Sequence, residues 1–479
     1  MAHPLTWHPP TDANPRYHRP FEGLEKYEYY MSTMNPKNPQ RAVIIGVTFP
    51  STSSTPYPVE SVKSAWRQLR YAHPVLGCKI TPKGYEFSIK SSEEIDEWVE
   101  STVKIVDSEQ LQDEFKKEEE EESPLKQFSC NLPYPDTAEL YYSPPTNSLF
   151  LQLRHEIIDG IGSLMLLNNF LQYLFSPNTT QTPPKDNPTL LSPSISEITN
   201  SAPPTPEILQ KNAELVKTYF STPTISLRLN PTLPQTPSSS NRQEYTLSTS
   251  QSSKILQSCK HHGITITHAV TASVALSILA LTNQNTGTFS TTFPTSLRDT
   301  LPYPYNTPSH AALMCITSPL PIIPVVVPGT TLVSLAKAVK KVYSDWKYDK
   351  DNIRYHGPQV EMFEQAMAAG LAPSNSAGKA TVVVSSLGIV ERYLTVSDSN
   401  NNNLVNGGIE EEGEGRIKDF WMGQVQGSSK IVVFLYTFAG KIRLATCYNS
   451  GFHEDGAVGE FIEVVVKTLY KGLGVDGIY

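Results

Sequence analysis

His155 and Asp159 lie four residues apart at the point of this sequence where catalytic chemistry is easiest to place. Leucines alternate with other residues over 149–153, which predicts a strand, and a periodic apolar segment beginning at Gly160 predicts a helix. His155 therefore falls in the turn between a strand and a helix, where a side chain can project into a cleft. A neutral imidazole there can accept a proton from a substrate, because the free pKa of histidine is about 6.5.

The same two residues also have structural interpretations, which their spacing alone leaves open. A histidine in a turn is more often a hydrogen-bonded structural residue than a catalytic base. An aspartate at the start of a helix most often caps it, although Asp159 could also orient the imidazole or pair with an arginine. The histidines His261, His262 and His268 lack the carboxylate or cysteine support of common zinc sites, so we predict no metal site.

The elements that must position this turn alternate between strands and helices along the chain. We expect, in chain order, a strand at 42–49, a helix at 59–71, a strand at 149–153, helices at 206–220 and 267–281, strands at 288–293, 380–385, 430–438 and 442–448, and a final helix at 458–470. Neither GxGxxG nor GxxxxGK[ST] occurs, so a nucleotide-phosphate cradle of either kind is not expected. The alternation predicts an α/β (α+β) fold.

Proline-rich segments divide the 479 residues into two lobes. The chain holds 39 prolines against 26 glycines, which predicts stiff connections. Residues 176–203 and 223–241 are rich in Pro, Ser, Thr and Asn and show little periodicity. We therefore predict an N-terminal lobe at 1–175, a crossover linker at 176–241 and a C-terminal lobe at 242–479. The glutamate run 118–122 is expected to be solvated, and the Asn/Gly/Glu-rich stretch 399–415 is expected to be a mobile loop.

Charge and composition exclude several classes of protein. The formal net charge is −8, and nucleic-acid binding needs a basic stripe that displaces counterions, so no nucleic-acid partner is expected. No run of about 18 apolar residues is present and the first ten residues lack the features of a leader, so we expect neither a membrane span nor secretion. Five scattered cysteines without a CxxC pair fit a reducing compartment, and we predict a cytoplasmic protein.

The segment from His155 to Gly160, HEIIDG, resembles the HxxxDG motif of the coenzyme A-dependent acyltransferases. This superfamily includes chloramphenicol acetyltransferase, plant BAHD acyltransferases, non-ribosomal condensation domains and fungal trichothecene O-acetyltransferases. Further similar segments keep the family order and span about residues 70–453; they are Arg70–Gly77, Thr295–Pro302, Val384–Gly388, Asp419–Gly423 and Tyr448–His453. The ordered set best resembles the fungal O-acyltransferases of secondary metabolism.

The resemblance implies a fold of two chloramphenicol-acetyltransferase-like lobes, each a mixed sheet with flanking helices, and a tunnel between them. It also implies transfer of an acyl group, with acetyl expected, to a hydroxyl or amine of a small secondary metabolite. The donor would be acyl-CoA, or a carrier-tethered thioester, acting as a co-substrate with no bound cofactor. We expect the enzyme to be a monomer.

The residues and the resemblance together suggest individual roles. His155 is expected to be the general base, and Asp159 is expected to pair with Arg298 and so fix the active-site turn. Ser385 or Ser386 is the candidate donor to a tetrahedral oxyanion. Gly160, Arg298 and Asp419 are expected to support the site structurally, and Lys337, Lys340 and Lys341 are candidates for binding coenzyme A, with a solvated helix face as their alternative role.

Two departures from the family pattern keep other functions open. Arg154 stands where condensation domains have the first histidine of HHxxxDG, which disfavours amide-forming condensation. The segment 419–423 reads DFWMG instead of DFGWG, so a non-transfer step such as cyclisation of a secondary metabolite is the main alternative. A hydrolase, for which the GxSxG elbow is missing, and a non-catalytic small-molecule binder are further alternatives.

Overall fold

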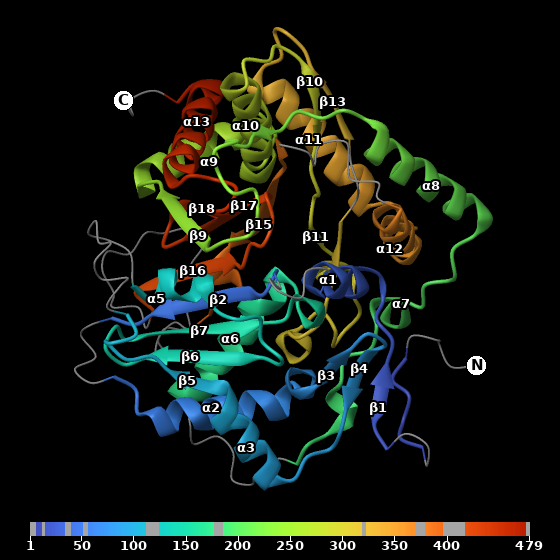
Figure 1. The fold of residues 1–479 in the computed structure, drawn as a ribbon, viewed down its shortest axis with the longest axis vertical. Coiled ribbons are helices and arrows are strands. Elements are labelled where there is room, and N and C mark those ends of the chain that lie inside the picture. The colour runs from blue at the N-terminus through green and yellow to red at the C-terminus, as the bar shows by residue number, and fades with distance from the viewer. Residues whose placement is uncertain are drawn as a thin grey trace.

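Two mixed β-sheets, each covered by helices, form the two lobes of the molecule (Figure 1). The computed structural model describes residues 6–11, 15–33, 40–50, 56–111, 124–176, 185–318, 322–369, 379–395 and 417–475. The glutamate run 118–122 and the stretch 399–415 lie outside these ranges. The α/β (α+β) fold expected from the sequence is confirmed.

The first lobe is built on a five-stranded sheet in the order β16-β2-β7-β6-β5. Its strands are β16 (Asp419–Gln424), β2 (Val43–Thr48), β7 (Ser148–Leu153), β6 (Glu139–Ser143) and β5 (Val103–Ile105), and its helices include α2 (Val59–Ala72), α3 (Ser92–Thr102) and α6 (Gly160–Phe175). Only β5 and β6 pair in parallel. Every residue of β7, including Ser148 and Gln152, is buried because β7 is a central strand between β2 and β6.

The second lobe repeats this plan with a four-stranded sheet in the order β15-β17-β18-β9. Its strands are β15 (Val382–Ile389), β17 (Ile431–Phe438), β18 (Lys441–Asn449) and β9 (Ser240–Thr246), and its helices are α9 (Thr249–His261), α10 (Ile266–Leu281), α11 (Leu332–Lys347) and α13 (Asp455–Leu473). β15 and β17 form its one parallel pair. α10 is apolar nearly all round because α11 and α13 pack against it and it lies in the core of this lobe.

The remaining elements close the sides of the two lobes. The strands are β1 (Tyr17–Arg19), β3 (Lys79–Thr81), β4 (Gly84–Phe87), β8 (Leu227–Arg228), β10 (Gly287–Ser290), β11 (Thr295–Ser296), β12 (Ile316–Thr317), β13 (Ile322–Val326) and β14 (Lys379–Ala380), and the helices are α1 (Gly23–Thr33), α5 (Pro124–Phe128), α7 (Ile195–Ile198), α8 (Pro206–Ser221) and α12 (Asn352–Ala368). Short 3₁₀ turns complete the chain, among them η3 (His155–Ile157) and η5 (Arg298–Thr300). α12 packs against both α1 and α8, so three distant segments meet beside the lobe junction (Figure 1).

The helices and strands expected from the sequence are all present, with ends displaced by a few residues. The helix expected at 206–220, for example, is α8, and the strand expected at 288–293 is the shorter β10. Among the described helices none alone has the length and apolar character to cross a bilayer; α9 and α10 pass that test only as a pair bent by 96°.

The domain boundaries expected from the sequence need two corrections. β16 belongs by position to the lobe at 242–479, yet it pairs antiparallel with β2 and completes the first sheet. Trp421 of β16 lies opposite Gly46, and a Cβ at Gly46 would come within 2.4 Å of the indole, so only glycine fits there. Residues 176–241 hold α8, the helix expected at 206–220, and in addition α7 and β8, which were not expected. The boundary followed the order of the chain, and which sheet a strand joins depends on partners that are distant in the sequence.

Candidate active site

The turn between β7 and α6 places His155 at the junction of the lobes. β7 ends at Leu153, η3 turns the chain, and Asp159 caps α6 by accepting a hydrogen bond from the backbone of Gly162 at 2.7 Å. His155 is half-buried, whereas the four residues that follow it are buried. The turn therefore holds one imidazole at the surface of a cavity and anchors its neighbours in the protein.

The hydrogen bond of His155 sets the chemistry of its ring. Nδ1 lies 3.0 Å from the carbonyl oxygen of Ile158, which can only accept, so Nδ1 carries the proton. The lone pair of the neutral ring is then on Nε2. A histidine held in this tautomer can act as a proton acceptor through Nε2.

Asp159 is fully buried and does not line the cavity. One carboxylate oxygen accepts from the Arg298 guanidinium at 3.2 Å and from the Cys315 backbone at 2.8 Å. Arg298 also donates to the carbonyl oxygens of residues 310, 311 and 313, so it ties that segment to the turn. The expected ion pair is present, and its geometry fits a structural role.

Two glycines allow this close packing. A Cβ at Gly162 would lie 2.4 Å from the carbonyl oxygen of Ala311 and 2.6 Å from the Arg298 guanidinium. A Cβ at Gly160 would lie 2.8 Å from a methyl group of Leu387, on β15 of the other lobe. Gly160 therefore lets the start of α6 approach the second lobe.

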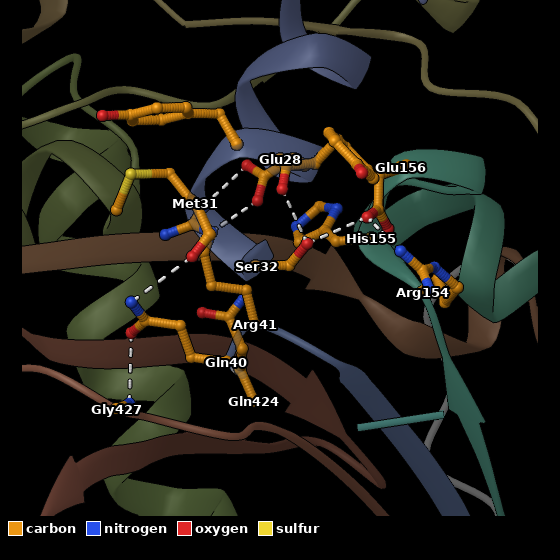
Figure 2. A network of polar contacts seen from close by, with 12 residues as sticks. Glu28, Met31, Ser32, Gln40, Arg41, Arg154, His155, Glu156, Gln424 and Gly427 are labelled. Atoms are coloured by element: carbon orange, nitrogen blue, oxygen red, sulfur yellow. Dashed lines mark hydrogen bonds and ion pairs between the residues drawn. The ribbon is translucent and has the colours of Figure 1, made fainter. Parts of the chain in front are cut away.

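A second buried network fixes the turn to α1 (Figure 2). The carboxylate of Glu156 is fully buried and pairs with Arg154 at 2.8 Å. It also accepts from the hydroxyl groups of Ser32 on α1 and Tyr134, both at 3.0 Å. Arg154, which stands where condensation domains carry a histidine, thus neutralises a buried carboxylate beside His155.

A cavity between the lobes surrounds His155. Its volume is about 970 Å³, counting the open space at its mouth. His155 and Gly160 line it from the first lobe, and Ser385, Ser386 and Phe434 line it from the second. We call it the His155 cavity. Its position satisfies the expectation that the functional space lies between the lobes.

A second cavity of about 650 Å³, again with its open space included, adjoins the first. We call it the α12 cavity, because residues of α12 including Phe363 form one wall and Tyr219 of α8 another. The residues that line both cavities are Leu24, Tyr27, Thr292, Ser318, Val383 and Lys430. These shared walls make the two cavities neighbouring parts of one space.

Ser385 and Ser386 both line the His155 cavity, although neighbouring residues of a regular strand point to opposite faces. The pairing of β15 with β17 shifts register between Ser386 and Gly388, and Gly388 adopts a φ of +72°. The shift follows the two serines, whose own pairs with Phe434 and Leu435 are in register. The Ser386 hydroxyl shares a 2.8 Å hydrogen bond with Thr267 of α10, which orients it.

The three lysines proposed for coenzyme A lie on the exposed face of α11. Lys340 donates to the carbonyl oxygen of Gly263 at 2.7 Å, and Lys341 pairs with Asp345 at 2.5 Å. Of the described residues that line either cavity, none is Lys337, Lys340 or Lys341. Their role in donor binding therefore stays a prediction. No metal site was expected, and no group of three or more His, Cys, Asp or Glu in the described ranges is placed to hold one.

Asp419 supports the lobe junction through a set of buried charges, the lobe-joining cluster: Lys126, Arg242, Glu244, Asp419 and Arg443. Asp419 pairs with Lys126 at 2.7 Å and with Arg443 at 2.6 Å, and Arg443 also pairs with Glu244 at 3.2 Å. Arg242 is bonded to Glu244 as well. Burial raises the pKa of Glu244, but Arg242, Lys126 and Arg443 outweigh it and lower that pKa to about 2.

Three charged residues in the His155 cavity had no role in the sequence prediction: Glu28, Arg41 and Lys430. Arg41 holds Glu28 through two contacts, one of them 2.6 Å long, and Figure 2 shows this pair beside His155. Arg41 also has a φ of +77°, an uncommon value outside glycine. Glu28 lies on α1, Arg41 lies two residues before β2, and Lys430 immediately precedes β17. No local pattern in the sequence links these three residues.

Comparison with known proteins agrees with this architecture, although no family model matches the chain. It is 25% identical over 469 residues to "O-acetyltransferase pigM" of Monascus ruber, which covers 95% of this chain and 85% of that protein. It is 22% identical to "Acetyltransferase pigO" of the same organism, covering 87% of this chain and 86% of the relative.

Solved structures with the same fold come from two groups of proteins. The TRI3 trichothecene 15-O-acetyltransferase of Fusarium sporotrichioides has a TM-score of 0.74 at 16% identity and covers 98% of both chains. The EpoB cyclization-docking bidomain of Sorangium cellulosum has a TM-score of 0.61 at 15% identity, covering 99% of this chain and 88% of that one. The chain therefore has the fold shared by fungal O-acetyltransferases and condensation-type domains, the superfamily that its HxxxDG motif resembles.

Proposed function

We propose that this protein transfers an acyl group, acetyl in the simplest case, from a coenzyme A thioester to a hydroxyl group of a small secondary metabolite. The observation that carries the proposal is the state of His155. Its Nδ1 proton is engaged by the Ile158 carbonyl, and the ring borders a cavity lined by both lobes. Two fungal relatives named as acetyltransferases support acetyl as the transferred group.

The proposed reaction uses the residues in the following roles. Nε2 of His155 accepts the proton of the acceptor hydroxyl while that oxygen attacks the thioester carbonyl carbon. Ser385 or Ser386 donates a hydrogen bond to the oxyanion that forms. When the intermediate collapses, the C–S bond breaks and the imidazolium returns its proton to the departing thiolate. Acyl ester and free coenzyme A are the products, and holding both substrates in one space contributes the rest of the rate.

Asp159 takes no direct part in this proposal. Its carboxylate is held by Arg298 and two backbone groups, so it positions the turn that presents His155. Acyl-CoA is a co-substrate, and a carrier-tethered thioester would serve the same chemistry. A monomeric state and a cytoplasmic location are part of the same proposal.

The experiment is a thioester assay with the purified full chain. Acetyl-CoA and a panel of hydroxylated fungal polyketides are supplied, free thiol release is followed, and products are identified by mass. We expect thiol release that depends on the acceptor and a product heavier by one acetyl group. His155→Ala should lower the rate by roughly 10²–10⁴ with unchanged folding. Turnover near the wild-type value in that variant would show that the base is another group.

Cyclisation is the second candidate, and the similarity of the fold to a protein named as a cyclization domain favours it over hydrolysis. The same assay separates the two functions. Comparing host metabolites with and without this protein would show an isomer or dehydrated product if the chain cyclises its substrate. Conversion of a metabolite without release of any free thiol would contradict acyl transfer.

A further inference from the structure

Lys430 stands where the His155 cavity and the α12 cavity meet. It immediately precedes β17 and lines both cavities. Residues 430, 432 and 434 all line the His155 cavity, as expected for alternate residues on one face of a strand. Its ammonium-bearing side chain therefore reaches the space that also contains the His155 ring.

The charges around Lys430 leave it without a counter-ion. Both carboxylate oxygens of Glu28 are bound by Arg41, so that pair is neutral as a unit. In the described part of the chain no carboxylate comes within ion-pair distance of the Lys430 ammonium. The carboxylate of Glu28 carries one negative charge, and Arg41 and Lys430 carry two positive charges, so the cavity has a net positive charge. An unpaired charge out of water is unfavourable, and an anionic ligand group would relieve that cost.

The protonation of Lys430 is compatible with such a role. Burial lowers its pKa to about 8, and Arg41 lowers it further than the nearby Glu28 raises it. The side chain therefore remains mostly protonated near pH 7. Apart from Glu28, no residue of the described cavity lining carries a carboxylate; the other polar groups there are an imidazole, an amide, a phenol and hydroxyl groups, which belong to His155, Gln424, Tyr27, Thr292, Ser296, Ser318, Ser385 and Ser386. Burial also raises the pKa of Tyr27, which keeps its hydroxyl neutral.

Aromatic side chains lie beside these charges, and the guanidinium of Arg41 stands 5.5 Å from the centroid of the Tyr27 ring. Tyr27 and Phe363 pack edge to face with their centroids 5.7 Å apart, and Phe363 lies 5.6 Å from Phe220. Leu24 and Val360 complete this apolar side of the α12 cavity. A ligand that contacts both Lys430 and this apolar side of the α12 cavity would have a flat apolar body and an acidic oxygen at one end.

We infer that Lys430 binds an anionic oxygen, a carboxylate or an enolate, of a substrate held in the His155 cavity. The inference rests on the proposed function, because it names the substrate class of the same site. The acid could belong to the acceptor or to the acyl chain of a dicarboxylic thioester such as malonyl-CoA. Both sources supply the same recognition chemistry, and the experiment below distinguishes them.

Binding, not turnover, is the readout, so this test stands apart from the assay of acyl transfer. Calorimetric titration of the full chain compares 2-naphthoate with its neutral methyl ester, and malonyl-CoA with acetyl-CoA. We expect at least one acidic probe to bind wild type roughly tenfold or more tighter than its neutral counterpart, in line with one charge-assisted contact. Lys430→Met should abolish that preference, and Lys430→Arg should retain it.

The matched control substitutes a lysine that lies on the protein surface. Lys254→Met removes an exposed lysine of α9 and should leave the preference unchanged. Lys430→Gln replaces the methionine variant if that protein does not fold. A preference for 2-naphthoate that persists with acetyl-CoA bound assigns the acid to the acceptor, and a preference for malonyl-CoA assigns it to the acyl group. Equal preference in wild type and Lys430→Met, or no preference in wild type, overturns the inference.

Discussion

The two buried charge clusters at the lobe junction differ in one respect: whether every charge has a protein partner. In the lobe-joining cluster each carboxylate contacts two cations: Glu244 contacts Arg242 and Arg443. Asp419 of β16 contacts Lys126 of α5, and it contacts Arg443 of β18 across the two sheets. In the His155 cavity Glu28 and Arg41 neutralise each other, while Lys430 faces open space. Charged residues thus stabilise the fold in the lobe-joining cluster, whereas in the His155 cavity we infer that Lys430 binds a ligand.

The difference also separates what each cluster does for stability. Removing one partner of a buried, satisfied pair leaves an uncompensated charge and is strongly destabilising. Removing a buried charge that has no partner takes away an unfavourable contribution. Substitutions in the lobe-joining cluster should therefore lower the free energy of unfolding. Removal of the Lys430 ammonium should leave that free energy unchanged or raise it.

Asp159 is expected to give the largest combined effect, because it belongs to a satisfied pair and also positions His155. Asp159→Ala leaves Arg298 buried without its carboxylate and should lower the free energy of unfolding by about 3–5 kcal/mol. It should also lower the transfer rate, in contrast to His155→Ala, which lowers the rate alone. Chemical denaturation and thiol release measure the two effects. An Asp159→Ala protein as stable as wild type would contradict the structural role.

Glu244→Gln should lower stability toward the lower end of about 3–5 kcal/mol, because Arg443 keeps its bond to Asp419. Catalysis by the folded protein should be unchanged, since Glu244 does not line either cavity. Urea unfolding and the kcat and KM of the folded fraction test the two statements. A changed KM with unchanged stability would contradict the assignment of Glu244 to folding and not to substrate binding.

Acid should weaken the lobe-joining cluster in a defined pH window. The pKa of Glu244 is about 2 in the folded protein and near its ordinary value of 4.5 when unfolded. A depressed folded pKa contributes stability above the unfolded pKa that is lost as the pH falls toward the folded one. Wild type and Glu244→Gln should therefore differ by about 3 kcal/mol at pH 6, and the difference should shrink between about pH 4.5 and pH 2. A difference independent of pH would point away from ionisation.

Lys430→Met should give the smallest effect on folding and one of the opposite sign. Removing the unpaired ammonium from the cavity should leave stability unchanged or raise it by about 1 kcal/mol. Thermal unfolding in the absence of ligand is the measurement, with Lys254→Met as the surface control. A loss of stability comparable to that of Glu244→Gln would show that Lys430 has a structural partner after all.

Local patterns in the sequence predicted most of the elements and the active-site turn. The apolar run of α10, the alternation in β7 and the cap at Asp159 depend on neighbours a few residues away, so the sequence displays them directly. The HxxxDG resemblance then led to His155. The place of Ser385 and Ser386 in the cavity lining could not be predicted, because it depends on how β15 is placed against the other lobe.

The charged cavity residues were missed for a related reason. A glutamate at 28, an arginine at 41 and a lysine at 430 each have the sequence character of a surface residue. Only the approach of α1, the segment before β2 and the start of β17 makes them neighbours. The same holds for β16, whose place beside β2 in the other lobe depends on a partner strand far away along the chain.

The sequence by itself therefore determined the helices, the strands and the histidine turn, because these depend on short-range periodicity and on residues adjacent in the chain. The tertiary structure alone decided which strand completes which sheet and which buried charges have partners. Charge pairing acts over a few ångströms in space and is indifferent to separation along the chain. That is why the pairing of Asp419 with Arg443 and the position of Lys430 at the cavity, without a carboxylate partner among the described residues, appear only in the tertiary structure.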